Sequence, residues 1–159
     1  MENIYKILAD LNISYEKYEH QAVFTCEEAG KYDMDIDAGK CKNLFLRNIK
    51  GDNHYLVVVE VNKRVDLKKL SETLKEDRLS FASDERLIKY LGLTSGAVSP
   101  FGLINDIGHE VNVIIDSEIL KNDKLSFHPN INTASLVISV DDFKIFLNWS
   151  GNNYKFIII

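Results

Sequence analysis

Apolar positions along the chain change their spacing repeatedly, and each change predicts a separate helix or strand. Residues 2–11 place four apolar side chains at intervals of three and four, which is the spacing of an amphipathic helix. Residues 14–18 alternate between apolar and polar and predict a strand. Thr25 followed by Glu28 has the spacing of a capping box, so a second helix is predicted from there to about Met34.

The remainder of the chain is richer in strands. Two β-rich runs, 42–48 and 55–61, are separated by turn-forming residues and predict a hairpin. The other predicted segments are a helix capped by Asp66, a strand at 79–82, a helix from Ser83 to Gly92, strands at 96–99, 111–116, 125–128 and 134–139, a helix near 141–148 and a strand at 154–159. Helices are interspersed irregularly, which favours an α+β class with a mixed, mainly antiparallel sheet or partial barrel flanked by helices.

Composition narrows the class of protein. The chain of 159 residues has only two prolines and eight glycines, with no linker or repeat, so one domain spanning residues 1–159 is expected. No apolar run approaches the roughly 18 residues that span a bilayer, and charged residues interrupt the first segment where a signal peptide stays apolar. Cys26 and Cys41 stand apart with no CxxC, so a reducing cytoplasm is expected.

Searches for familiar chemistry give mostly negative results. The chain has no GxSxG, P-loop, GxGxxG or HExxH motif, and nothing marks a serine nucleophile. Its histidines lack metal-ligand spacing, so no metal or other cofactor is expected; they are His20, His54, His109 and His128. Cys41 lies between Lys40 and Lys42, which would lower the pKa of a thiol, but inert packing of a strand cysteine is the favoured interpretation.

Lys42 begins a predicted strand and raises a question of orientation. Alternation places Lys42, Leu44 and Leu46 on one face of that strand, and Asn43 and Phe45 on the other. If the leucines point inward, the lysine reaches the interior or the mouth of a pocket. The alternative, favoured by periodicity alone, is a lysine at the end of the strand with its ammonium group in water.

Two further segments have unusual composition. Gly96 to Pro100 forms a G-x-x-x-P sequence of small residues, which would let a backbone approach a ligand closely. A turn between elements is the alternative and is favoured when this segment is considered alone. His128 precedes Pro129 and is held extended, with hydrogen-bonding side chains in the next residues. A structural histidine is the alternative there.

Taken together and in order, these segments resemble the YbaK/prolyl-tRNA-synthetase-associated editing domain family, and within it the free-standing prolyl-tRNA editing type. The matching runs are Glu19–Thr25, Lys42–Leu46, Lys63–Asp66, Leu79–Ser83, Leu91–Asp106 and Phe127–Ala134. The resemblance covers nearly the whole chain. Gln21 departs from the family, which has proline after the histidine at this point.

The resemblance implies an aminoacyl-tRNA deacylase that removes alanine from tRNA for proline, although relatives remove cysteine or other small amino acids. Lys42, Gly96 and His128 are implied as catalytic: Gly96 N–H, with Ala97 N–H, would bind the substrate carbonyl, and Lys42 a phosphate near the terminal adenosine. His128 would position the aminoacyl end. The residues implied in substrate binding are Phe24, Thr25, Asn43, Ala97, Ser99, Pro100, Phe101, Asn130 and Thr133.

The resemblance also implies partners. These are the acceptor end of tRNA for proline and, transiently, prolyl-tRNA synthetase; no DNA, membrane or cofactor is implied. A non-catalytic module that binds aminoacyl-tRNA or an amino acid is the alternative function.

Charge is unevenly distributed along the sequence. The net charge is −5, which argues against a general nucleic-acid binder. Residues 40–78 nevertheless carry a net charge of +4, and this segment includes Lys42, Lys63, Arg64, Lys68 and Lys69. Such a local basic patch would hold an acceptor end weakly and with strong salt dependence. Two solvated faces are the alternative interpretation of the same charges.

Overall fold

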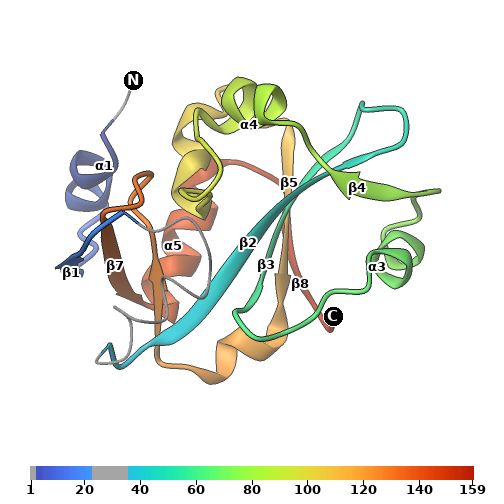
Figure 1. Ribbon diagram of the computed structural model, residues 1–159. Coiled ribbons are helices and arrows are strands. Elements are labelled where there is room, and N and C mark those ends of the chain that lie inside the picture. Colours follow the sequence, from blue (N-terminus) through green and yellow to red (C-terminus); the bar gives the residue numbers. More distant parts are fainter. Residues whose placement is uncertain (1–2, 23–35) are drawn as a thin grey trace.

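Strongly apolar strands and short capped helices form the structure, a computed structural model that describes residues 3–22 and 36–159 (Figure 1). The strands are β1 (Glu16–Glu19), β2 (Gly39–Asn48), β3 (His54–Glu60), β4 (Leu79–Phe81), β5 (Val111–Asp116), β6 (Lys124–Phe127), β7 (Ala134–Ser139) and β8 (Tyr154–Ile157). The α-helices are α1 (Ile4–Asp10), α3 (Leu67–Thr73), α4 (Asp84–Leu91) and α5 (Val140–Ser150), and the 3-10 helices are η2 (Pro100–Asn105) and η3 (Ser117–Lys121). Within the described ranges, no helix has the length and apolarity needed to cross a membrane.

The strands form one mixed sheet in the order β1-β7-β6-β2-β3-β5-β8, with β4 paired to β2. Neighbours are antiparallel in the pairs β1–β7, β7–β6, β2–β3 and β2–β4. They are parallel in the pairs β6–β2, β3–β5 and β5–β8. This arrangement confirms the predicted α+β class with a mixed sheet.

Strand β2 joins the two halves of the sheet and runs diagonally through the molecule in Figure 1. One side of β2 pairs with β3 from Cys41 to Arg47. On the other side, the register with β6 ends at Lys40 and the register with β4 begins at Leu46, next to Phe45, whose carbonyl oxygen accepts from Ala82 N–H at 2.9 Å. Residues 41–44 therefore have no strand partner on that side among the described residues, and we call them the open edge of β2.

Two hydrophobic clusters cover the two faces of the central strands. The larger cluster contains Phe45 and Val58 and is closed by Phe143 and Phe146 of α5. The smaller cluster contains Leu46, Tyr55, Val57, Val59, Leu70, Leu79 and Ile114, and α3 covers it. Figure 1 accordingly shows α5 and α3 on opposite sides of β2 and β3. Each face of the sheet is thus buried by its own helix, as the alternation of side chains along a strand requires.

Most segments predicted from the sequence appear within a few residues of their expected bounds, but the strand predicted at 96–99 is wrong. Ser95 and Gly96 form a turn, and Gly96 has a φ of 91°, which is outside the range of a strand. Pro100 then begins η2 with Ser99 as its N-cap, because proline has no N–H to donate and suits the first turn of a helix. The helix predicted from Thr25 to Met34 lies outside the described residues.

Candidate active site

Two asparagine side chains connect the three segments that the sequence singled out. Asn43 Nδ2 on β2 donates to the carbonyl oxygen of Val98 at 3.2 Å. Asn130 Nδ2 donates to the carbonyl oxygen of Phe101, also at 3.2 Å. The strand that begins near Lys42, the G-x-x-x-P segment and the loop after β6 therefore meet at one place, although they lie far apart in the sequence.

A hydrogen bond within the loop after β6 determines which ring nitrogen of His128 carries a hydrogen. His128 Nδ1 lies 2.8 Å from the carbonyl oxygen of Ala134. A carbonyl oxygen only accepts, so Nδ1 carries the hydrogen, and in the neutral ring Nε2 is the accepting nitrogen. Asn130 has a φ of 64° in the same loop, a left-handed conformation that asparagine tolerates better than most residues. The loop thus turns sharply and keeps the histidine and the asparagine on the same segment.

His20, which directly follows β1, is hydrogen-bonded to this loop and was not among the residues assigned to the site from the sequence. Its backbone N–H donates to the Thr133 carbonyl oxygen at 2.9 Å. Its Nδ1 donates to the Gln21 carbonyl oxygen at 2.8 Å, and its Nε2 lies 3.1 Å from Ser135 Oγ, from which it accepts in the neutral ring. The rings of His20 and His128 lie edge to face with centroids 6.0 Å apart. The only signal for His20 in the sequence was its place in the run that resembles the editing family.

The backbone of the G-x-x-x-P segment offers one of the two N–H groups that the resemblance implied. Ala97 N–H donates to the Thr94 carbonyl oxygen at 3.1 Å and closes the turn, so it is not available to a substrate. Gly96 N–H makes no backbone hydrogen bond within the described residues. The expectation of two neighbouring donors is therefore corrected to one, because the positive φ of Gly96 folds the next amide back onto the turn.

Ser99, Pro100 and Phe101 were expected to bind substrate. Their buried contacts determine the conformation of the G-x-x-x-P segment. Ser99 is fully buried, and its Oγ accepts from the Phe101 N–H at 3.1 Å as the N-cap of η2. Pro100 is buried at the first position of that helix. Phe101 packs edge to face on Phe127 and Phe146, with ring centroids 5.8 and 5.2 Å away. Their side chains fix the position of the segment, and what they present to the site is backbone.

The other three residues expected to bind substrate are Thr133, Phe24 and Thr25. Thr133 is exposed and contributes its carbonyl oxygen to the bond with His20. Phe24 and Thr25 lie outside the described residues.

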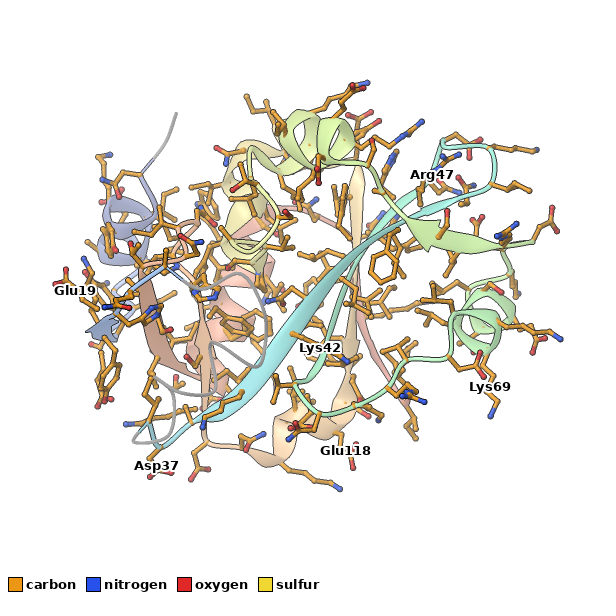
Figure 2. All side chains as sticks on the ribbon, viewed as in Figure 1. Glu19, Asp37, Lys42, Arg47, Lys69 and Glu118 are labelled. Carbon is orange, nitrogen blue, oxygen red and sulfur yellow. The ribbon has the colours of Figure 1, made fainter. Side chains whose placement is uncertain are left out.

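The Lys42 side chain lies on the opposite face of β2 from Asn43, because successive side chains of a strand alternate. Figure 2 labels Lys42 beside β2. Its register partner is Val59, which belongs to the smaller cluster, whereas Asn43 faces the Val98 carbonyl. The lysine is half-buried, and its ammonium group makes no hydrogen bond or ion pair among the described residues. Lys42 therefore lies at the end of the leucine face and on the open edge of β2, next to the site but across the strand from it.

The chemistry of Cys41 excludes it as a nucleophile. Burial, with a smaller contribution from the charge of Glu60, raises the pKa of the Cys41 thiol to about 12. A thiol with this pKa stays protonated at neutral pH and reacts slowly. The structure supports the expected inert packing of this cysteine. The neighbouring lysines do not offset the effect of burial on the pKa of the Cys41 thiol.

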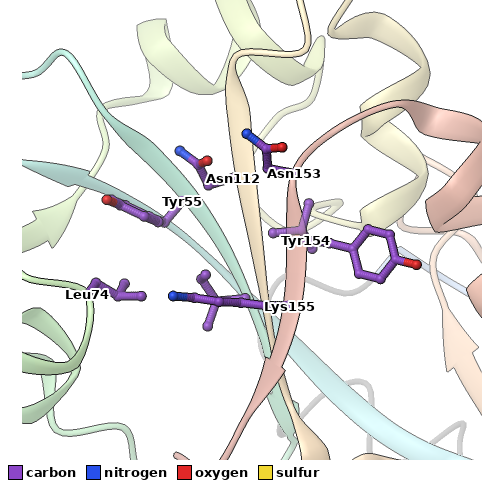
Figure 3. A pocket seen from close by; sticks show the side chains of 8 residues that line it. Tyr55, Leu74, Asn112, Asn153, Tyr154 and Lys155 are labelled. Carbon is purple, nitrogen blue, oxygen red and sulfur yellow. The ribbon is translucent and has the colours of Figure 1, made fainter.

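A separate cavity of about 250 Å³ lies on the side of the smaller cluster (Figure 3). Its lining residues are Tyr55, Leu74, Asn112, Val113, Ile114, Asn153, Tyr154 and Lys155. None of them belongs to the candidate site. The Tyr55 hydroxyl donates to Glu76 at 2.9 Å, and burial together with Glu76 raises the pKa of Tyr55 to about 12. The Tyr55 hydroxyl therefore stays protonated at neutral pH.

The basic segment is partly neutralised by ion pairs. Lys63 Nζ lies 2.5 Å from Asp116 and 3.0 Å from Glu118. Arg64, Lys68 and Lys69 are exposed. The basic patch predicted from the sequence thus excludes Lys63, whose charge balances the buried Asp116.

The fold and the site define an α+β domain of the kind found in proteins that edit aminoacyl-tRNA. A crystal structure of a proposed trans-editing enzyme for prolyl tRNA synthetase aligns with a TM-score of 0.72 at 18% identity, covering 98% of this chain and 94% of that one. The sequence-family model of the aminoacyl-tRNA editing domain matches residues 20–146 of this chain. The chain therefore belongs to the aminoacyl-tRNA editing domain family, whose chemistry is that of an aminoacyl-tRNA deacylase.

Two curated relatives support this assignment. The prolyl-tRNA editing protein ProX of Acetoanaerobium sticklandii is 44% identical over 148 residues, which is 93% of this chain and 90% of the relative. The prolyl-tRNA synthetase associated domain-containing protein 1 of Mus musculus is 33% identical over 150 residues, which is 92% of this chain and 88% of the relative. The similarity therefore extends over almost the full length of each protein.

Proposed function

We propose that this protein hydrolyses the ester of mischarged tRNA for proline in trans, and that alanine is the amino acid it removes. The observation that carries the proposal is the meeting of β2, the Gly96 turn and the His128 loop at one site in a chain that is 44% identical to a prolyl-tRNA editing protein. A cytoplasmic location and a transient association with prolyl-tRNA synthetase follow from the same proposal.

The reaction requires a positioned water and no protein nucleophile, which agrees with the high pKa of Cys41. An aminoacyl ester is already activated, so water adds to its carbonyl carbon once the developing oxyanion is stabilised. Gly96 N–H is the donor proposed for that oxygen. The ester C–O bond then breaks, the ribose oxygen takes the proton, and the free amino acid and the uncharged tRNA leave.

His128 and the tRNA itself supply the remaining roles. In the neutral ring of His128, Nε2 accepts a hydrogen bond and positions the aminoacyl end, and the neighbouring ribose hydroxyl of the substrate helps to orient the water. Lys42 binds the phosphate next to the terminal adenosine as a point charge. Since Lys42 and Asn43 point to opposite faces of β2, the acceptor end would cross the open edge of β2 between them.

Alanine as the amino acid removed is the most specific part of the proposal. One methylene group in an apolar pocket changes selectivity by only about 1–3 kcal/mol, so a site for alanine will also accept similarly small residues to some degree. The test is a hydrolysis assay with alanyl, cysteinyl and seryl esters of tRNA for proline, and with the correctly charged prolyl ester as control. Release of alanine well above background with the prolyl ester intact is expected, whereas no release from any ester would favour the non-catalytic binding module.

Replacing Lys42 tests the role of its charge. Lys42→Ala should slow the hydrolysis of alanyl-tRNA for proline by at least about 100-fold, equivalent to roughly 2.7 kcal/mol of transition-state stabilisation, and leave the melting temperature close to that of the wild type. Lys50→Ala, on the exposed turn after β2, is the matched control and should keep full activity. Near-normal turnover by the Lys42 variant would remove this residue from the site.

A further inference from the structure

The side-chain oxygens of Asn43 and Asn130 are buried without a hydrogen-bond partner. Only two other buried side-chain atoms in residues 3–22 and 36–159 share this property, Tyr5 Oη and Asn152 Oδ1. Leaving such an acceptor unpaired costs about 1–3 kcal/mol, so native proteins rarely do so without a reason. Two of these rare atoms lie in the candidate site, on the two residues that join its segments.

The orientation of both amides is fixed by their partners. Each Nδ2 faces a backbone carbonyl oxygen, of Val98 for Asn43 and of Phe101 for Asn130. A carbonyl oxygen cannot donate, so the amide must present its NH₂ group there and its oxygen on the other side. The two partner carbonyls are three residues apart on the same segment, which places both acceptors around the Gly96 to Phe101 backbone.

A ligand that completes this site must therefore bring a donor. The ester group of an aminoacyl-tRNA has only acceptor oxygens, for which Gly96 N–H is the matching group. The strongest donor of the aminoacyl end is its α-ammonium group, with three N–H bonds and a positive charge. We propose, on the basis of the proposed function, that Asn43 Oδ1 and Asn130 Oδ1 accept hydrogen bonds from the α-ammonium group of the aminoacyl ester.

This arrangement gives each side of the substrate's α-carbon its own recognition group. The carbonyl oxygen meets a donor from the turn, and the ammonium group meets two acceptors anchored on β2 and on the His128 loop. Uncharged amide acceptors bind an ammonium group without the unpaired negative charge that a buried carboxylate would leave in the empty site. The site thereby selects an amino acid ester over an ester that lacks the amine.

The test compares two esters of nearly equal size on the same tRNA, alanyl and lactyl, in which a hydroxyl replaces the ammonium group. Each rate with enzyme is divided by the uncatalysed rate of the same ester. The wild type should accelerate the alanyl ester at least about tenfold more than the lactyl ester, since charge-assisted hydrogen bonds are the stronger ones. Equal acceleration of both esters would overturn the inference and leave the proposed deacylase intact, whereas acceleration of neither would overturn the proposed function itself.

Two variants locate the effect. Asn43→Ala and Asn130→Gly should each reduce the preference for the alanyl ester at least about threefold, and glycine suits the positive φ of residue 130. Asn62→Ala, in the exposed turn after β3, is the control for amide removal and should keep the full preference. A full preference in both site variants would contradict the assignment of these oxygens, and the comparison of the two esters by the wild type stands even if a variant does not fold.

Discussion

At the scale of single residues, His54 shows how burial changes the chemistry of a side chain. It is 2% exposed and lies against Tyr90 and Phe45, with ring centroids 4.1 and 5.7 Å away. Its Nε2 accepts from Arg86 Nη1 at 2.9 Å. Burial first, and then the positive charge of Arg86, lowers the pKa of His54 to about 4. The ring is therefore neutral in the folded protein at pH values where an unfolded histidine is charged.

This pKa predicts a loss of stability in mild acid. Between pH 6.5 and about 4 the unfolded chain binds a proton at His54 that the folded chain does not. The free energy of unfolding therefore decreases as the pH is lowered through this window, and the contribution of His54 to stability is complete above it. The expected loss is on the order of 3 kcal/mol. Urea unfolding at pH 7 and pH 4.5 measures it, and His54→Gln should reduce the difference whereas His109→Asn, at an exposed site, should not. Parallel behaviour of the wild type and His54→Gln would contradict the assignment.

At the scale of an element, α4 depends on its two ends. Ser83 Oγ accepts from Arg86 N–H as the N-cap, and Gly92 ends the helix with a φ of 65°. Gly92→Ala should lower the free energy of unfolding by about 1–2 kcal/mol, because the left-handed conformation strains a side chain and the new Cβ would lie 2.8 Å from Asn105 Nδ2. Gly108→Ala is the matched control, since its Cβ would meet only the flexible Glu110 side chain at 3.3 Å. Equal effects in chemical unfolding would contradict this account.

The same helix shows what the sequence can predict about an element, and the Gly96 segment shows what it cannot. Ser83 and Gly92 are local signals, and both bounds of α4 followed from them. Ala97 to Ser99 is a short run of small residues. Its conformation depends on the positive φ of Gly96 and on the buried cap at Ser99, and neither feature produces a repeating pattern of apolar residues in the sequence. Tertiary contacts decide such a segment, so the predicted strand was wrong.

At the scale of the whole molecule, charge bears on how a tRNA would bind. The helix α3 lies on the same side of the sheet as Lys42 and exposes Lys68 and Lys69 (Figure 2). The double variant Lys68→Glu and Lys69→Glu should weaken the binding of uncharged tRNA for proline and reduce the slope of log K against log salt by about 1–2. Fluorescence anisotropy over a salt series measures both. Lys6→Glu on α1 is the control; it changes the net charge by half as much, so a loss of half the size there would show that only net charge matters.

The candidate site was predictable only in part at this scale. Alternation in the sequence separated Lys42 from Asn43 correctly, but the face occupied by the site depends on how β6 and β4 leave β2, which is a property of the assembled sheet. His20 and its bonds to the His128 loop were missed for the same reason, because β1 meets that loop only in the folded chain. Local signals located the segments, and long-range pairing determined the geometry between them.

The position of β2 also has a consequence for the order of folding. Its pairing with β3 closes across a tight turn, its pairing with β4 needs a longer loop, and its pairing with β6 joins segments from opposite halves of the chain. Because loop closure becomes costlier with length, we expect the β2–β3 hairpin to form early and the contact of Gly39 and Lys40 with β6 to form last. Pulse-labelled hydrogen exchange would then protect the amides of β2 that face β3 before the amides of β6 that face β2. Among the three pairings of β2, the one that ends next to the candidate site would therefore be the last to form.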